Sequence, residues 1–126
     1  MTGAVLDNSA AVLLSMEAML LGDETQYYAP ELIDLEFANA FRKLVLRGAL
    51  GPNVAGDHLS EWSANELIRC SHALLLPRVW ELRDNITPYD AAYVALAEVL
   101  GVPLVTADLH LARAAEPYCE VIVIGQ

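Results

Sequence analysis

The chain has 126 residues, the length of one domain, and its seven Lys and Arg against seventeen Asp and Glu give a formal net charge of −10. The content of 56% hydrophobic residues excludes a disordered acidic tail. No apolar run reaches the roughly 18 residues that span a membrane, and the N-terminus lacks the basic start of a signal peptide. We therefore expect a single cytoplasmic domain over residues 1–126, with no membrane partner and with Cys70 and Cys119 as reduced core thiols.

Short apolar runs alternate with helical patterns in the first half of the chain. The sequence predicts a strand at 4–6, a helix from there to about Leu21, a turn at 22–24, a strand at 26–29, a helix at 31–47 and a second helix at 53–65. The helix at 31–47 has typical start and end signals, because Pro30 precedes it and Gly48 follows it.

The same alternation continues in the second half. The sequence predicts a strand at 67–70, a helical segment at 72–84 that breaks at Pro77, a helix at 88–100, a strand at 103–106, a helix at 109–115 and a strand at 121–124. Short buried strands separated by helices predict an α/β domain with a central parallel sheet of about five strands, flanked by helices on both faces. Any ligand site is then expected at the carboxyl ends of the strands.

Two acidic residues closely follow predicted strands. Asp7 comes directly after the run at 4–6, and Asp108 follows the run at 103–106. Both therefore fall on the edge of the sheet where such domains build their sites. Each also precedes a helix, so helix capping explains either residue taken alone.

Glu36 lies within an apolar helix face. The stripe at i, i+3 and i+4 spacing is formed by Ile33, Phe37, Ala40, Phe41 and Leu44. A carboxylate on that face has to be paired, protonated or bound to a metal, since an unpaired buried charge costs several kcal/mol. Its neighbours one turn away on the same helix carry no positive charge, so an ion pair would have to come from another element.

Asp90 allows two interpretations. With Thr87 as the N-cap, Asp90 takes the third helical position, which suits a capping box and the helix dipole. It also precedes Tyr93 and Val94 on the face that we expect to be buried. The sequence leaves both interpretations open.

The joint pattern says more than each acid alone. If these side chains converge, two carboxylates at about 4 Å and an effective dielectric constant of about 20 repel one another by about 4 kcal/mol. A divalent cation relieves that repulsion, and an all-oxygen site suits Mg²⁺ or Mn²⁺. The three histidines show no zinc-ligand spacing. We call Asp7, Glu36, Asp90 and Asp108 the four carboxylates.

Four segments in order along the chain resemble the acidic motifs of PIN domains. They are residues 5–10 (VLDNSA), 35–42 (LEFANAFR), 89–98 (YDAAYVALAE) and 104–108 (LVTAD). With the chain length, this resembles the VapC toxins of type II toxin–antitoxin systems. The likeness covers essentially the whole chain.

The resemblance implies a PIN-like three-layer fold and a ribonuclease whose Mg²⁺ site is formed by the four carboxylates. Ser9 and Thr106 match hydroxyl positions of the motifs and are expected to support the site. Asn39, one helical turn after Glu36, is expected to orient that carboxylate. The resemblance also implies an RNA substrate, a homodimer and a cognate VapB-type antitoxin.

The expected reaction is attack of a metal-activated water on a phosphodiester. Either Asp90 or Glu36 could accept the proton of that water, and the sequence does not assign the role. A basic group formed by Arg42, Lys43 and Arg47 is a candidate contact to the RNA backbone, and a solvated polar face explains it equally well.

Three other classes are weighed against this prediction. A receiver domain needs a phosphorylatable Asp after a central strand and a Lys after a late strand, but Asp57 follows no apolar strand and the only lysine is Lys43. An aspartyl-phosphate hydrolase needs a second Asp two residues after the first, where Ser9 stands. The remaining alternative is a non-catalytic PIN-like module that binds RNA or a protein.

Overall fold

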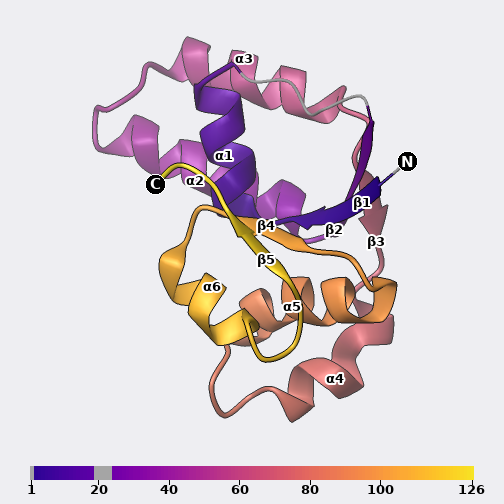
Figure 1. Cartoon of the computed structure of the whole chain (residues 1–126). Coiled ribbons are helices and arrows are strands. Elements are labelled where there is room, and N and C mark those ends of the chain that lie inside the picture. Colours follow the sequence, from indigo (N-terminus) through magenta and orange to yellow (C-terminus); the bar gives the residue numbers. More distant parts are fainter. Residues whose placement is uncertain (1, 19–23) are drawn as a thin grey trace.

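Strands and helices alternate along the computed structural model, which describes residues 2–18 and 24–126 (Figure 1). The strands are β1 (Thr2–Leu6), β2 (Thr25–Pro30), β3 (Ile68–Cys70), β4 (Leu104–Thr106) and β5 (Val121–Val123). The helices are α1 (Asn8–Met16), α2 (Ile33–Leu46), α3 (Pro52–Ser63), the short 3₁₀ helix η1 (Ala73–Leu75), α4 (Leu76–Glu81), α5 (Pro88–Leu100) and α6 (Leu109–Ala115). Each lies where the apolar pattern predicts an element of that type.

The strands form one parallel sheet in the order β3-β2-β1-β4-β5. β1 is central and pairs with β2 on one side and β4 on the other, with Ala4 opposite Tyr27 and Val5 opposite Leu104. The chain thus moves outward from β1 through β2 and β3, and then returns to build the other half with β4 and β5. The reversal of strand order lies between β1 and β4, which is where open α/β sheets bind ligands.

Helices cover both faces of this sheet. α1, α2 and α3 lie on one face, and α4, α5 and α6 lie on the other (Figure 1). Val5, Leu6 and Leu104 are fully buried between these layers, as their uninterrupted apolar runs predict. The predicted three-layer α/β fold with a parallel sheet is confirmed.

Local sequence signals set several helix ends. The Oγ1 of Thr87 accepts a hydrogen bond from the amide of Asp90, and Gly101 ends α5 with a left-handed φ of 67°. Pro77 occupies the first turn of α4, directly after η1, so the predicted break is confirmed.

The first helix is shorter than predicted. α1 ends at Met16, and Ala18 adopts a φ of +54°, a conformation that ends a helix. The rest of that prediction, at 19–21, and the turn residues 22 and 23 lie outside the described residues. No helix in the described ranges is long and apolar enough to cross a membrane. The free thiols of Cys70 and Cys119 are half-buried at the edge of the core.

An aromatic stack holds α2 against α3. The ring of Phe37 lies 4.3 Å from that of Trp62 and 4.8 Å from that of Phe41, measured between centroids. The indole N–H of Trp62 donates to Asp34 Oδ1 at 2.7 Å, and the guanidinium of Arg69 on β3 donates to both oxygens of the same carboxylate. These contacts fix the first turns of α2, the part of the helix that carries Glu36.

Candidate active site

The fold brings the four carboxylates to the carboxyl edge of the sheet at its topological switch point. Asp7 follows β1 and Asp108 follows β4, while Glu36 and Asp90 lie in the first turns of α2 and α5. Burial raises the pKa of Asp7, Glu36 and Asp90, and neighbouring carboxylates raise it further in each case. Asp108 acts in this way on Asp7 and Asp90, while Asp7 and Asp90 act on Glu36. Each of the four carboxylates thus lies close enough to at least one other for their charges to interact.

Asp7 is both a helix cap and the most buried of the four. Its side chain is 4% exposed, and its Oδ1 accepts the amide of Ala10 at 2.9 Å as the N-cap of α1. Its Oδ2 accepts the hydroxyl of Thr106 at 2.6 Å. The hydroxyl of Ser9 lies 2.8 and 2.9 Å from the two carboxylate oxygens and 3.1 Å from the hydroxyl of Thr106. Both hydroxyls named from the sequence thus hold Asp7 directly.

This hydrogen bonding leaves Asp7 with spare acceptor capacity. Ser9 has a single hydroxyl proton, so it donates to one oxygen of Asp7 at a time. With Ala10 and Thr106, the carboxylate receives at most three hydrogen bonds, against about four lone-pair sites. One site is left for a cation.

Glu36 is held by a residue that sequence reasoning missed. The hydroxyl of Tyr93 donates to Glu36 Oε1 at 2.5 Å, and the phenol ring is 1% exposed. Burial, the hydrogen bond and the nearby carboxylates all raise the pKa of Tyr93 above its ordinary value of 10.0, so the hydroxyl remains a donor. Asn39, expected to orient Glu36, is exposed and makes no side-chain hydrogen bond to it in the described part of the chain. The sequence did hold a signal for Tyr93: it lies on an apolar helix face, where its buried hydroxyl needs a hydrogen-bond partner.

Asp90 does not form the capping box that the sequence allowed. Thr87 caps the amide of Asp90, but no hydrogen bond from the described residues reaches the Asp90 carboxylate. The side chain is half-buried, and the only cationic influence on it comes from His110, which lowers its pKa against the larger effect of burial. Both of its oxygens are available to a ligand.

Asp108 caps α6 with one oxygen. Its Oδ1 accepts the amides of His110 at 2.9 Å and Leu111 at 3.3 Å. Its Oδ2 receives no hydrogen bond from the described residues, and the side chain is exposed. Capping and a role at the site are therefore compatible, as they are at Asp7.

None of the four carboxylates has a salt-bridge partner among the described residues, where the ion pairs are Arg69–Asp34, Arg78–Glu81 and Arg78–Glu98. Within the same ranges, no group of three or more His, Cys, Asp or Glu side chains is arranged to hold a metal ion by itself. Mg²⁺ needs no such group, since it keeps several waters and is commonly bound through one or two carboxylates and a substrate phosphate. The donor set consists of oxygen atoms alone and forms no salt bridge with the described residues, so it fits a hydrated divalent ion.

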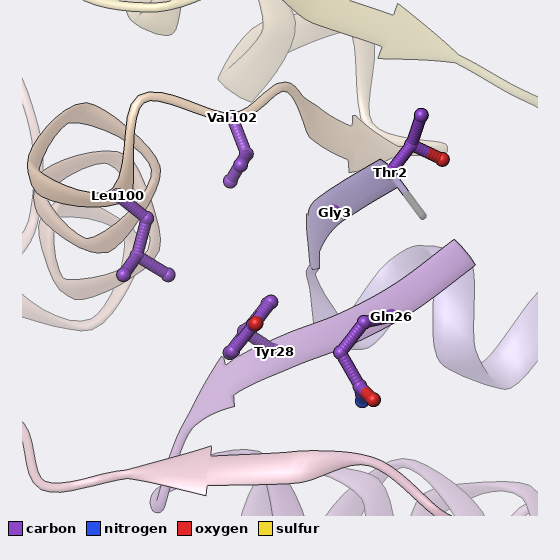
Figure 2. Close-up of a pocket in the computed structure, with 6 residues that line it drawn as sticks. All are labelled: Thr2, Gly3, Gln26, Tyr28, Leu100 and Val102. Atoms are coloured by element: carbon purple, nitrogen blue, oxygen red, sulfur yellow. The ribbon is translucent and has the colours of Figure 1, made fainter. Parts of the chain in front are cut away.

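The carboxyl edge of the sheet, where the four carboxylates lie, is separate from two hollows lined by described residues. One, of about 210 Å³, lies at the opposite edge of the sheet and is lined by Thr2, Gly3, Gln26, Tyr28, Leu100 and Val102 (Figure 2). It holds no carboxylate or basic group. The other, of about 250 Å³, is an apolar groove between α2 and α3 with Arg42 at its border. Arg42 and Lys43 on α2 and Arg47 at its C-cap are all exposed, so their contact with RNA stays a prediction beside the solvated-face alternative.

Without metal, the fold is expected to gain stability as the pH falls from 7 towards 5. The raised pKa values of Asp7, Glu36 and Asp90 mean that the folded state binds protons more tightly than the unfolded chain, whose values lie near 3.8 and 4.5. Against the effect of burial, hydrogen bonds from Arg69 and Trp62 lower the pKa of Asp34, so Asp34 stabilises the fold above the unfolded value of 3.8 and loses that contribution as the pH falls towards and below it. Urea unfolding in EDTA at pH 7.5, 6 and 5 measures this, and a steady loss of stability over that range would contradict it.

The comparisons with known proteins agree on one family. Ribonuclease VapC9 of Mycobacterium tuberculosis is 37% identical over 115 residues, which cover 91% of each chain. Ribonuclease VapC1 of the same species is 39% identical over 97 residues, covering 76% of this chain and 73% of the relative. No protein-family model matches the chain.

Two solved structures share the fold. The crystal structure of PAE2754 from Pyrobaculum aerophilum has a TM-score of 0.69 at 23% identity and covers 94% of this chain and 90% of its own. The structure of VapBC2 from Rickettsia felis bound to a DNA fragment from its promoter contains a chain with a TM-score of 0.71 at 14% identity. The match covers 97% of this chain and 98% of that one. At these identities the structures support the three-layer α/β fold alone.

Proposed function

This chain belongs to the VapC family of PIN-domain ribonucleases, and from that membership we propose that it is a divalent-cation-dependent endoribonuclease, the toxin of a toxin–antitoxin pair. What supports the proposal is that four carboxylates follow the ends of β1 and β4 or lie in the first turns of α2 and α5, close enough in pairs to raise one another's pKa, with no salt-bridge partner among the described residues. Such a cluster opposes folding and needs a reason in function.

The cation would be Mg²⁺ or Mn²⁺, held by carboxylate oxygens that other donors leave open. These are the remaining site on Asp7, both oxygens of Asp90, Oδ2 of Asp108 and Oε2 of Glu36. When bound, such an ion lowers the pKa of a coordinated water and polarises a phosphate oxygen.

The protein's own groups position and deprotonate the nucleophile. Ser9 and Thr106 hold Asp7 in one orientation, so that it keeps its place when substrate binds. We assign the role of proton acceptor to Asp90, because no hydrogen bond from the described residues occupies its two oxygens, so that one can bind the ion while the other accepts the proton of the water. As the water oxygen gives a proton to the carboxylate and forms a bond to phosphorus, the bond from phosphorus to the 3′-oxygen breaks, and the departing oxygen takes up a proton from solvent water. The products are a 5′-phosphate and a 3′-hydroxyl.

The partners follow from the same charges. RNA would contact the exposed Arg42, Lys43 and Arg47 through its backbone. A VapB-type antitoxin would place Arg or Lys beside the four carboxylates, where charge-assisted hydrogen bonds are strong. One solved structure of the same fold is named VapBC2 and is bound to a DNA fragment from its promoter. We propose a homodimer as the form of this chain that the antitoxin binds.

The proposal is tested by mapping the RNA ends that the purified protein produces from single-stranded RNA. We expect cleavage with Mg²⁺ or Mn²⁺ and none in EDTA, with 5′-phosphate and 3′-hydroxyl ends. Asp7→Asn should remove cleavage, whereas Asp57→Asn, the same change on exposed α3, should not. Metal-independent cleavage, or an Asp7→Asn protein as active as the parent, would refute it. Binding of RNA without cleavage would favour the non-catalytic module instead.

A further inference from the structure

One side-chain hydrogen bond joins the two helix layers at the site. Glu36 lies on α2 and Tyr93 on α5, 57 positions apart, and these helices cover opposite faces of the sheet (Figure 1). The other side-chain hydrogen bonds between helices of the described residues, such as Arg78 to Glu98, stay within one layer. The contact between Tyr93 and Glu36 passes beyond the end of the sheet, where the four carboxylates meet.

Tyr93 contacts one of the four carboxylates and shares a helix with another. From Ala91 to Ala97, every residue of α5 is buried, and the phenol hydroxyl is the one polar side-chain group in that run. Asp90 lies three residues earlier, so the two share a helix face. Tyr93 therefore connects Glu36 to the helix that carries Asp90.

We propose that Tyr93 is a positioning residue for the cation site: its hydroxyl fixes Oε1 of Glu36, leaves Oε2 free to bind the ion and ties Glu36 to the helix that carries Asp90. This inference rests on the proposed function. A hydrogen bond to an ionised carboxylate at 2.5 Å is short and strongly directional, so it leaves Glu36 one rotamer rather than several. The alternative is that Tyr93 only fills the core and uses Glu36 to satisfy its hydroxyl.

The test is Tyr93→Phe in the full chain, which removes one oxygen and keeps the ring. Calorimetric titration with Mn²⁺ alone should show affinity weakened by about 10–100-fold, the usual effect of losing a partner of a metal ligand. The rate constant kcat should fall while KM for RNA stays close to that of the parent. Tyr89→Phe is the matched control, since Tyr89 is 66% exposed on the same helix and should change neither quantity.

A second measurement covers the case in which Tyr93→Phe folds poorly. In the parent labelled with 3-fluorotyrosine, Mg²⁺ should shift the ¹⁹F signal of buried Tyr93 and leave that of exposed Tyr89 in place. An unshifted Tyr93 signal at saturating Mg²⁺ would overturn the inference, as would unchanged Mn²⁺ affinity in Tyr93→Phe. If the parent itself binds no Mn²⁺, the proposed function fails together with this inference. If the parent binds Mn²⁺ and cleaves RNA but Tyr93→Phe matches it, only the role of Tyr93 falls.

Discussion

Asp90→Asn is expected to slow RNA cleavage by about 10²–10⁴-fold, the usual contribution of a positioned proton acceptor. The amide keeps the size and polarity of the side chain but no longer accepts a proton or carries a charge. No hydrogen bond from the described residues reaches the Asp90 carboxylate, so the exchange breaks no visible contact of the fold. Single-turnover rates at saturating Mg²⁺ measure the effect.

The same variant should be more stable than the parent when metal is absent. Burial and the nearby Asp108 carboxylate raise the pKa of Asp90, which means that its charged form opposes folding at neutral pH. Asn removes that charge, so the free energy of unfolding in EDTA at pH 7.5 should rise. Asp57→Asn, on an exposed position of α3, is the matched control for both measurements. A variant that loses stability and keeps full activity would show that Asp90 is a structural residue.

Phe37→Ala is expected to lower the free energy of unfolding by about 3–5 kcal/mol, the range measured for large aromatic side chains removed from protein cores. Phe37 is fully buried and stacks on Trp62 at 4.3 Å with the two rings 13° from parallel. Its loss leaves a cavity between α2 and α3 and frees the turn of α2 that carries Glu36. Equilibrium urea unfolding measures the change.

Leu35→Ala is the control on the same helix. Leu35 is 78% exposed, so its truncation should change stability by no more than about 0.5 kcal/mol. If the two variants unfold at the same urea concentration, the stack between α2 and α3 does not hold the helix. The Phe37→Ala protein should also bind Mn²⁺ more weakly, because Glu36 follows the position of α2.

Local patterns were enough to predict most of the fold. Each run that the sequence predicts as a strand forms a strand of the parallel sheet. Pro77 lies at a break between two helices and Gly101 at a helix end, because proline restricts the backbone and glycine frees it. The end of α1 was misjudged, because the left-handed backbone of Ala18 has no signature in its side chain. Strand order has no local signal, so the placement of β1 between β2 and β4 became visible only in the sheet.

The sequence by itself identified the four candidate carboxylates, because a carboxylate directly after a buried strand or on an apolar helix face is unusual in any fold. Only the tertiary structure decided how each one is used. It showed Asp7 and Asp108 capping helices while keeping acceptor sites open, Asp90 without the capping-box contact that the sequence allowed, and Glu36 bound to Tyr93 rather than to Asn39. The reason is physical: burial and charge proximity depend on residues up to 99 positions apart, such as Asp7 and Thr106, which meet only when the strands pair.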